Sequence, residues 1–155
     1  MSVRPYYKRD ISIMKRLSKT NKAYIAGIID GEGCVRVCRK TTKNGGSYQA
    51  FVCVTNSNEA LLYWLKEVTE IGCVYKYKKS AKKNWKLVHR FQVVSQNACD
   101  LLRSILPYLK IKKEVADVVL SMPINKRGHR NLTPIQETLF MRTKVLNTRG
   151  LILAN

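Results

Sequence analysis

Apolar residues recur first at helical spacing and then at alternating spacing, and the chain passes through this change twice. Residues 24–33 form a short apolar stretch that ends on acids and glycines, which predicts a helix terminating at Gly33. Residues 34–40 and 48–55 alternate between apolar and polar, and the glycine-rich turn between them predicts an antiparallel hairpin. The core-facing positions of this hairpin are predicted to be Val35, Val37, Val52 and Val54.

The second part of the chain repeats the helix and the hairpin and then continues as helices. Asn58 is placed to cap a helix that extends to about residue 69, and Thr133 with Pro134 is placed to open one that extends to about residue 146. Between them we predict strands at roughly 74–79 and 85–95 and helices at about 98–105 and 113–121. The order predicts an α+β fold with one antiparallel sheet whose inner face is covered by helices.

The 155 residues are enough for one compact domain with its own core, and 45% of them are hydrophobic. No internal repeat, low-complexity tract or Pro/Ser-rich linker divides the chain. We therefore expect a basic N-terminal extension over residues 1–21 and a single domain over 22–155. The extension lacks the apolar segment of a secretory signal. Its basic composition fits an organellar transit peptide as well as a DNA-side arm, and the sequence leaves both open.

Charge and cysteine content narrow the functional classes. The chain has 29 basic and 10 acidic residues, a formal net charge of +19, which points to nucleic acid or an anionic membrane surface. No apolar run approaches the roughly 20 residues of a membrane-spanning helix, so we expect no membrane partner. The 5 cysteines include no C-x-x-C pair, which favours free thiols in a reducing compartment over a zinc site. We expect an intracellular protein, with the organelle of the encoding genome as one location.

Basic residues gather on the two predicted hairpins, with no acid among residues 34–55 or 75–90. Charge runs usually mark a solvated face, but solvated faces mix the two signs. A two-stranded ribbon fits the major groove of B-DNA, where alternate side chains reach base edges and phosphates. The candidate DNA-binding residues are Arg36, Cys38, Lys40, Lys43, Tyr48 and Gln49 on the first hairpin and Lys76, Lys78, Lys79, Lys82, Lys83, Lys86, Arg90 and Gln92 on the second.

The helix at residues 24–33 places acids where a helix disfavours them. Carboxylates near a helix C-terminus cost a few tenths to about 1 kcal/mol each, yet this acid-poor chain has Asp30 and Glu32 there. Such an apolar helix, delivering carboxylates into a basic protein, indicates metal-dependent chemistry on a polyanion. The residues expected to bury against the core are Tyr24, Ile25, Ile28 and Ile29.

One face of the same helix has almost no side chain. Ala23, Gly27 and Gly31 recur every four residues, a spacing that lets a second helix approach closely. If two copies packed in parallel across a two-fold axis, both Glu32 carboxylates would converge and could recruit Mg²⁺ together with a substrate phosphate. The predicted dimer-interface residues are Ala23, Ala26, Gly27 and Asp30.

Residues 25–33 resemble the LAGLIDADG motif of homing endonucleases, and the predicted element order resembles their αββαββα fold over roughly residues 22–120. A single motif copy implies the homodimeric branch, in which motif helices form the interface and two sheets form a DNA-binding saddle. The resemblance implies a site-specific double-strand DNA endonuclease, often intron-encoded, that uses Mg²⁺ or Mn²⁺. Its target would be long and roughly palindromic.

The resemblance also assigns roles to individual residues. Glu32 occupies the position of the metal-binding acid, with the Gly31 carbonyl as a further ligand, and Asp30 that of a structural acid. Asn56 corresponds to a residue that orders solvent near the metal, and Lys112 to a basic residue that polarises the scissile phosphate. From the residues alone, a solvated acid, a strand-end cap and a surface lysine stay open as alternatives. An RNA maturase and a catalytically inactive DNA-binding protein of the same fold also stay open.

Overall fold

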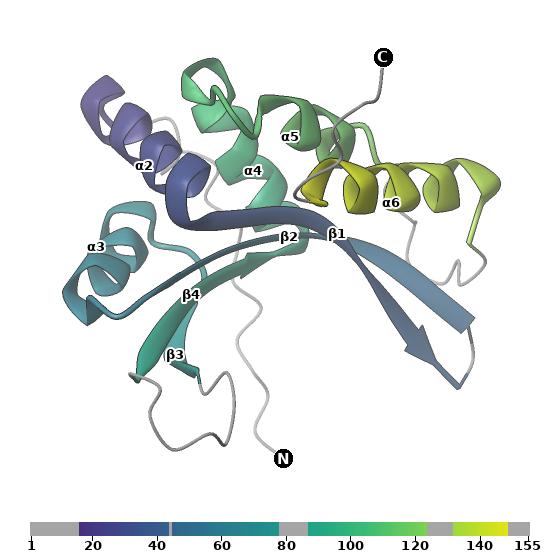
Figure 1. Cartoon of the computed structure of the whole chain (residues 1–155), viewed down its shortest axis with the longest axis horizontal. Helices are drawn as coiled ribbons and strands as arrows, with labels where there is room; N and C mark the ends of the chain where they lie inside the picture. Colours follow the sequence, from purple (N-terminus) through teal and green to yellow (C-terminus); the bar gives the residue numbers. More distant parts are fainter. Residues whose placement is uncertain (1–15, 44, 78–86, 124–131, 149–155) are drawn as a thin grey trace.

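The computed structural model describes residues 16–43, 45–77, 87–123 and 132–148. Helices and strands follow one another along the chain in the predicted order (Figure 1). The strands are β1 (Gly33–Thr42), β2 (Gly45–Asn56), β3 (Cys73–Tyr77) and β4 (Val88–Val94). The helices are α2 (Lys19–Glu32), α3 (Glu59–Thr69), α4 (Ser95–Ile105), the 3₁₀ turn η1 (Leu106–Tyr108), α5 (Lys113–Leu120) and α6 (Pro134–Asn147).

The strands form one 4-stranded antiparallel sheet in the order β1-β2-β4-β3. The two hairpins therefore join through β2 and β4, and β1 and β3 lie at the edges. Figure 1 shows α2, α4, α5 and α6 on one side of the curved sheet, and no described helix covers the other side. The predicted α+β fold, with a curved antiparallel sheet and helices on one face, is confirmed.

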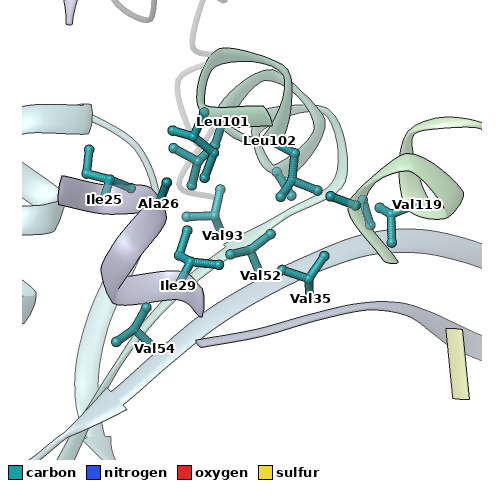
Figure 2. Packing of buried hydrophobic residues seen from close by; sticks show 14 of the residues in the cluster. Ile25, Ala26, Ile29, Val35, Val52, Val54, Val93, Leu101, Leu102 and Val119 are labelled. Atoms are coloured by element: carbon teal, nitrogen blue, oxygen red, sulfur yellow. The ribbon is translucent and has the colours of Figure 1, made fainter. Parts of the chain in front are cut away.

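The core lies between the helices and the inner face of the sheet. Figure 2 shows Ile25 and Ile29 of α2 packed over the sheet, where Val52 is fully buried. Burying one such side chain contributes about 1.5–3 kcal/mol. The prediction of the inward positions on the first hairpin is confirmed, since each is at most 3% exposed: Val35, Val37, Val52 and Val54.

Helix α2 passes directly into β1 at Gly33. The Gly33 N–H donates to the Ile29 carbonyl, which closes the helix. A Cβ atom at Gly33 would lie 2.7 Å from the Ile29 Cα and carbonyl oxygen, so only glycine fits. Gly33 therefore ends the helix as predicted, and it pairs with Val54 in the first rung of the sheet.

Two other helix starts also follow their sequence signals. The Asn58 side chain accepts from the Leu61 N–H at 3.2 Å, which caps α3. Thr133 and Gln136 form a reciprocal capping box around Pro134 at the start of α6. Both caps satisfy backbone N–H groups that a helix leaves without an internal partner.

The second hairpin and α4 differ from the predicted boundaries. Strands β3 and β4 begin at Cys73 and Val88, and the predicted strand residues within 78–86 lie outside the described residues. Helix α4 begins at Ser95, earlier than the predicted residue 98. Ser95 adopts φ 57°, and this left-handed residue turns the chain straight from β4 into α4.

The buried face of α2 is narrower than predicted. Tyr24 is 54% exposed, so the prediction that it is buried is wrong. Its ring instead stands edge-on against Trp64 of α3, with the ring centroids 5.2 Å apart. Ile25 and Ile29 supply the fully buried contacts, while Ile28 packs at the margin of the core.

Across the described ranges, no helix combines the length and the apolar character needed to cross a membrane.

Candidate active site and nucleic-acid interface

Asp30 ties the end of α2 to the segment between η1 and α5. Its carboxylate accepts hydrogen bonds from the backbone N–H groups of Lys110 at 2.8 Å and Lys112 at 2.9 Å. In return, the Lys112 ammonium donates to the Asp30 carbonyl oxygen, one of those that a helix end leaves unpaired. This reciprocal contact fixes the Lys112 side chain at the C-terminal end of α2.

The contact accounts for one of the two acids at this helix end. Burial raises the pKa of the Asp30 carboxyl group. The hydrogen bonds from the backbone of Lys110, Lys112 and Ile111, with the charge of Lys112, outweigh burial and hold the pKa below its usual value. The unfavourable helix dipole is thus offset by donors from a neighbouring segment.

Glu32 is the last residue of α2, and its side chain is exposed. Among the described residues it makes no hydrogen bond or ion pair. The following residue, Gly33, pairs with Val54, which brings the end of β2 with Asn56 alongside the end of α2. The structure therefore gathers Glu32, Asn56 and Lys112 at one corner of the sheet. Their catalytic roles stay predictions.

Asn56 has a local structural contact at this corner. Its side-chain oxygen accepts from the Asn58 N–H at 2.8 Å, which shapes the turn from β2 into α3. This is the strand-end cap that the residues alone left open. The amide nitrogen of Asn56 can still donate, since the turn uses only the oxygen.

The donor set at this corner fits part of a metal site. In the part of the chain that the structure describes, no three His, Cys, Asp or Glu side chains cluster to hold a metal ion. Glu32 offers a carboxylate and Gly31 a carbonyl, the hard oxygen ligands that Mg²⁺ prefers. These oxygens fit part of the coordination shell of a divalent cation, and its remaining ligands would have to come from outside this set of residues.

The uncovered face of the sheet, called here the open face, carries alternate residues of all four strands. Across one row, Cys34, Cys53, Gln92 and Cys73 lie directly opposite one another in register. Residues paired in this way point to the same side of a sheet, whereas their chain neighbours point to the core. By the same register, Arg36, Cys38, Lys40, Gln49, Arg90 and Gln92 lie on the open face as predicted.

Polar side chains on the open face are held by their neighbours. The Arg36 guanidinium lies 4.7 Å from the centre of the Phe51 ring, which places its charge over the sheet. Arg90 Nε donates to Thr55 Oγ1 at 3.2 Å, one strand away. Such contacts lower the side-chain entropy that binding would otherwise cost.

Cys34 and Cys53 face one another across β1 and β2. The Cys53 thiol lowers the pKa of Cys34; burial opposes the shift, and the charges of Arg36, Lys112 and Arg90 add to it. The Cys34 thiol and burial raise the pKa of Cys53.

The prediction that Tyr48 binds DNA is wrong, because Tyr48 lies on the inner face. It pairs with Arg39 in register, its ring packs on Phe140 of α6, and its hydroxyl donates to Glu137. The signal was present in the sequence, since Tyr48 has the same parity as Val52 on one strand.

Lys76 is also misplaced by the sequence prediction. Its register partner is His89, which is buried, so Lys76 lies on the helix-covered side at the end of the sheet. Lys43 is exposed in the turn between β1 and β2. The remaining predicted DNA contacts of the second hairpin lie outside the described residues: Lys78, Lys79, Lys82, Lys83 and Lys86.

The outer face of α2 has the predicted small residues, with one correction. A Cβ atom added at Gly27 or Gly31 would meet no described atom within 4 Å, so nothing in the described part of the chain requires glycine there. Ala23 is exposed on the same helix. Ala26 is completely buried in the core, so its predicted place in a dimer interface is wrong.

Sequence reasoning missed Tyr75, Thr55 and Lys110. Tyr75 and Thr55 flank Arg90 in a row of the open face, and strand alternation from Val54 and Val74 would have placed both there. The contact of Lys110 with Asp30 joins segments far apart in the chain, and no local pattern reveals it.

Residues 25–94 match the sequence profile of the LAGLIDADG endonuclease family. The match extends from the helix with the two acids through both hairpins, and the fold agrees with it. This segment of the chain is therefore similar to the LAGLIDADG endonuclease family. No curated protein sequence gives a significant match.

Several solved structures share the fold. The homing endonuclease I-CvuI, in complex with the I-CreI target, has 20% sequence identity and a TM-score of 0.66, over 86% of this chain and 85% of that chain. The archaeal intron-encoded homing endonuclease I-Vdi141I, complexed with DNA, has 16% identity and a TM-score of 0.60, over 88% and 89% of the two chains. The I-LtrWI enzyme, bound to target DNA, has 21% identity and a TM-score of 0.57, over 86% of this chain but 46% of its own.

Proposed function

We propose that the chain is a homodimeric, divalent-metal-dependent endonuclease that cuts double-stranded DNA at a long, roughly palindromic site. The observation that carries the proposal is the corner at the end of α2. There an exposed Glu32 carboxylate follows an Asp30 that is locked to Lys112, next to the open face of the sheet. An acid and a lysine at the edge of a basic surface suit the hydrolysis of a phosphodiester.

The outer face of α2 supports the dimer. The open space beyond Gly27 and Gly31 leaves a flat strip along which a second helix could pack closely. Two large apolar side chains near this helix are also exposed, Tyr24 at 54% and Ile111 at 76%. Exposed apolar groups of this kind are typical of an interaction surface when they lie together. The DNA-bound I-LtrWI chain, of which this fold covers 46%, is about the size of two copies.

The metal would be held by the Glu32 carboxylate and the Gly31 carbonyl of each chain. A bound divalent cation would supply Lewis-acid stabilisation of the charge that develops at the scissile phosphate. Lys112, held in place by the Asp30 carbonyl, would orient the phosphate through its positive charge. Asn56, whose oxygen is fixed by the turn, would donate from its amide nitrogen to solvent at this corner.

The open face would contact the DNA. Its Arg36 and Arg90 side chains carry positive charge, and the residues between them can reach base edges. Solved structures with this fold include homing endonucleases bound to DNA, which supports the proposal. Two such faces related by a two-fold axis would read a target whose halves are similar.

The proposal is tested with Glu32→Gln, which keeps the side-chain volume and removes the charge. Purified protein is incubated with a DNA library and Mg²⁺, and the ends of the products are mapped. The wild type should produce defined breaks. Glu32→Gln should bind the same sites but cleave them at least about a hundredfold more slowly. Even changes to residues that only hydrogen-bond to a metal's ligands lower metal affinity or activity by about 10–100-fold. Glu67→Gln, an exposed acid on α3, is the matched control and should cleave normally.

Each other outcome rejects part of the proposal. Full cleavage by Glu32→Gln would exclude Glu32 as a metal ligand. A wild type that binds defined sites but makes no breaks would be a DNA-binding protein, and one that stimulates intron splicing without cutting DNA would be a maturase. A stable monomer in sedimentation with and without DNA would exclude the homodimer.

A further inference from the structure

The two glutamines of the open face are oriented in the same way. Tyr75 Oη donates to the Gln92 side-chain oxygen at 2.6 Å from the neighbouring strand β3. Ser95 Oγ donates to the Gln49 side-chain oxygen at 3.3 Å. In both cases a hydroxyl on the protein takes up one of the two lone pairs of the amide oxygen, and the amide nitrogen is left to hydrogen-bond elsewhere.

Gln92 is the strong hydrogen-bonding side chain of its row. Its register partners on both sides are Cys53 and Cys73, and thiols are weak donors and acceptors. Among the described residues, no donor interaction of the Gln92 amide nitrogen is present. Its two N–H groups are therefore the main polar feature that this row offers to a ligand.

The adjacent row of the open face also carries a side chain that donates hydrogen bonds. Arg90 lies two residues before Gln92 on β4 and is oriented by Thr55 through a 3.2 Å hydrogen bond. A guanidinium group has donors and no acceptor. Tyr75 uses its hydrogen in the bond to Gln92. In the patch formed by Tyr75, Arg90 and Gln92, the two nitrogen-bearing side chains therefore supply the donors, and the Tyr75 oxygen can only accept.

The base edges of the major groove differ in what they offer to such a patch. Guanine presents two acceptors, N7 and O6, whereas adenine presents the N7 acceptor beside an N6 donor. Glutamine reads adenine by using its oxygen and nitrogen together. In this protein the adenine amino group would have to share the Gln92 oxygen with Tyr75.

We propose that Tyr75 acts as a positioning residue that fixes Gln92 as a hydrogen-bond donor, so that the patch selects guanine over adenine in the major groove of the target. The inference rests on the proposed function, because it requires DNA on the open face. It adds that one base in each half of the target is recognised by its hydrogen-bond acceptors. Tyr75 acts through Gln92 and does not itself need to touch the base.

The test is a selection of bound sequences from a randomised duplex library, using the full chain without divalent metal so that binding is read apart from cleavage. The wild type should enrich guanine over adenine by roughly tenfold at one position in each half-site, within the range for a bidentate contact. Gln92→Glu should identify that position, because a carboxylate only accepts hydrogen bonds and should shift the preference to cytosine.

Tyr75→Phe removes the hydroxyl and keeps the ring. The freed Gln92 oxygen can then accept from adenine, so the guanine-to-adenine ratio should fall to about one or below, while overall affinity changes less than about threefold. Tyr63→Phe is the matched control, since Tyr63 is an exposed tyrosine on α3, and it should leave every position unchanged. Ser95→Ala should produce a smaller shift at a different position, because its bond to Gln49 is longer.

Three results would overturn the inference. Adenine enriched by the wild type at the position altered in Gln92→Glu would contradict the donor assignment. An unchanged base preference in Tyr75→Phe, with enrichment otherwise intact, would remove Tyr75 from recognition and leave the proposed function standing. A library with no enriched sequence for any variant would reject site-specific DNA binding itself, and the inference with it.

Discussion

The two hairpins of the sheet present similar outer faces but are supported differently from behind. The first hairpin, β1 and β2, is the longer, and α2, α4, α5 and α6 all pack on one or both of its strands. The second hairpin, β3 and β4, is short, and α3 is the helix that packs on both of its strands. The difference is in how each hairpin holds its outer side chains in place.

Helix α6 extends the support of the first hairpin towards its turn. Tyr48 packs on Phe140 with ring centroids 5.1 Å apart, and its hydroxyl donates to Glu137. Arg39 lies 3.8 Å from the same carboxylate. At the other end of α6, the Asn147 side chain donates to the Val35 carbonyl on the edge strand. The outer residues of this hairpin therefore stand on a backbone held from the inner side.

The inner face of the second hairpin changes quickly from apolar to polar. Phe91 is 1% exposed, but two residues earlier His89 is also buried, with no hydrogen-bond partner for either ring nitrogen among the described residues. Its Nε2 lies 3.3 Å from Glu59, in a geometry that is not a hydrogen bond. On this hairpin the outer residue Gln92 is held from the side, by Tyr75 of the neighbouring strand.

The largest expected effect comes from Phe91→Ala, because Phe91 is the large buried side chain that holds β4 to the core. Truncating a buried Phe costs about 3–5 kcal/mol of unfolding free energy. Denaturant unfolding at pH 7 measures the loss. The control is Phe140→Ala on α6, which is only partly buried and should cost about half as much or less. Equal losses at the two positions would contradict the difference in support.

A smaller effect is expected for Tyr48→Phe, which removes one hydrogen bond and keeps the packing on α6. The loss should be about 1 kcal/mol at pH 7. Burial, then the hydrogen bond and the charge of Glu137, raise the pKa of Tyr48. A raised pKa means that the contribution is complete below the unfolded value of about 10 and disappears as pH rises through the folded value.

The stabilities of the wild type and of Tyr48→Phe should therefore converge above pH ~10. Urea unfolding at pH 7 and at pH 10.5 measures both differences. Tyr63→Phe, at an exposed tyrosine, should show neither effect. A constant difference across this pH range would mean that the Tyr48 hydroxyl is not bound to Glu137 in the folded protein.

The fold was predictable because its signals are local. Alternation marked the inward valines, Asn58 and Thr133 marked helix starts, and Gly33 marked the end of α2. Each of these depends on a few neighbouring residues, for which periodicity and capping chemistry suffice. The boundary of α4 was missed because Ser95 adopts a left-handed conformation that residues other than glycine rarely take.

The candidate site was predictable only in part. The family resemblance assigned roles to Glu32 and Lys112, which stay predictions, but the lock between Asp30 and Lys110 joins residues 80 positions apart and has no local signature. Tyr48 was assigned to the open face because its hydroxyl suits DNA, although its parity with Val52 placed it inside. The residue type of Tyr48 suggested a role in DNA binding, whereas its place in the strand alternation indicated which face of the sheet it lies on. The alternation should have taken precedence.

The smallest perturbation is chemical labelling. It tests whether the two hairpins contribute equally to DNA contact on the open face despite their different support from behind. Cys38 lies on the open face of β1 and Cys73 on that of β3, while Cys99 is buried in α4. Iodoacetamide should modify Cys73 faster than Cys38, whose pKa burial raises. Target DNA should slow both about tenfold when about 90% of the protein is bound, because only free protein reacts. Mass spectrometry of the peptides measures each rate, and Cys99 should stay slow with and without DNA. Protection of Cys38 alone would mean that DNA contacts the first hairpin only, in which case Gln92 could not read a base.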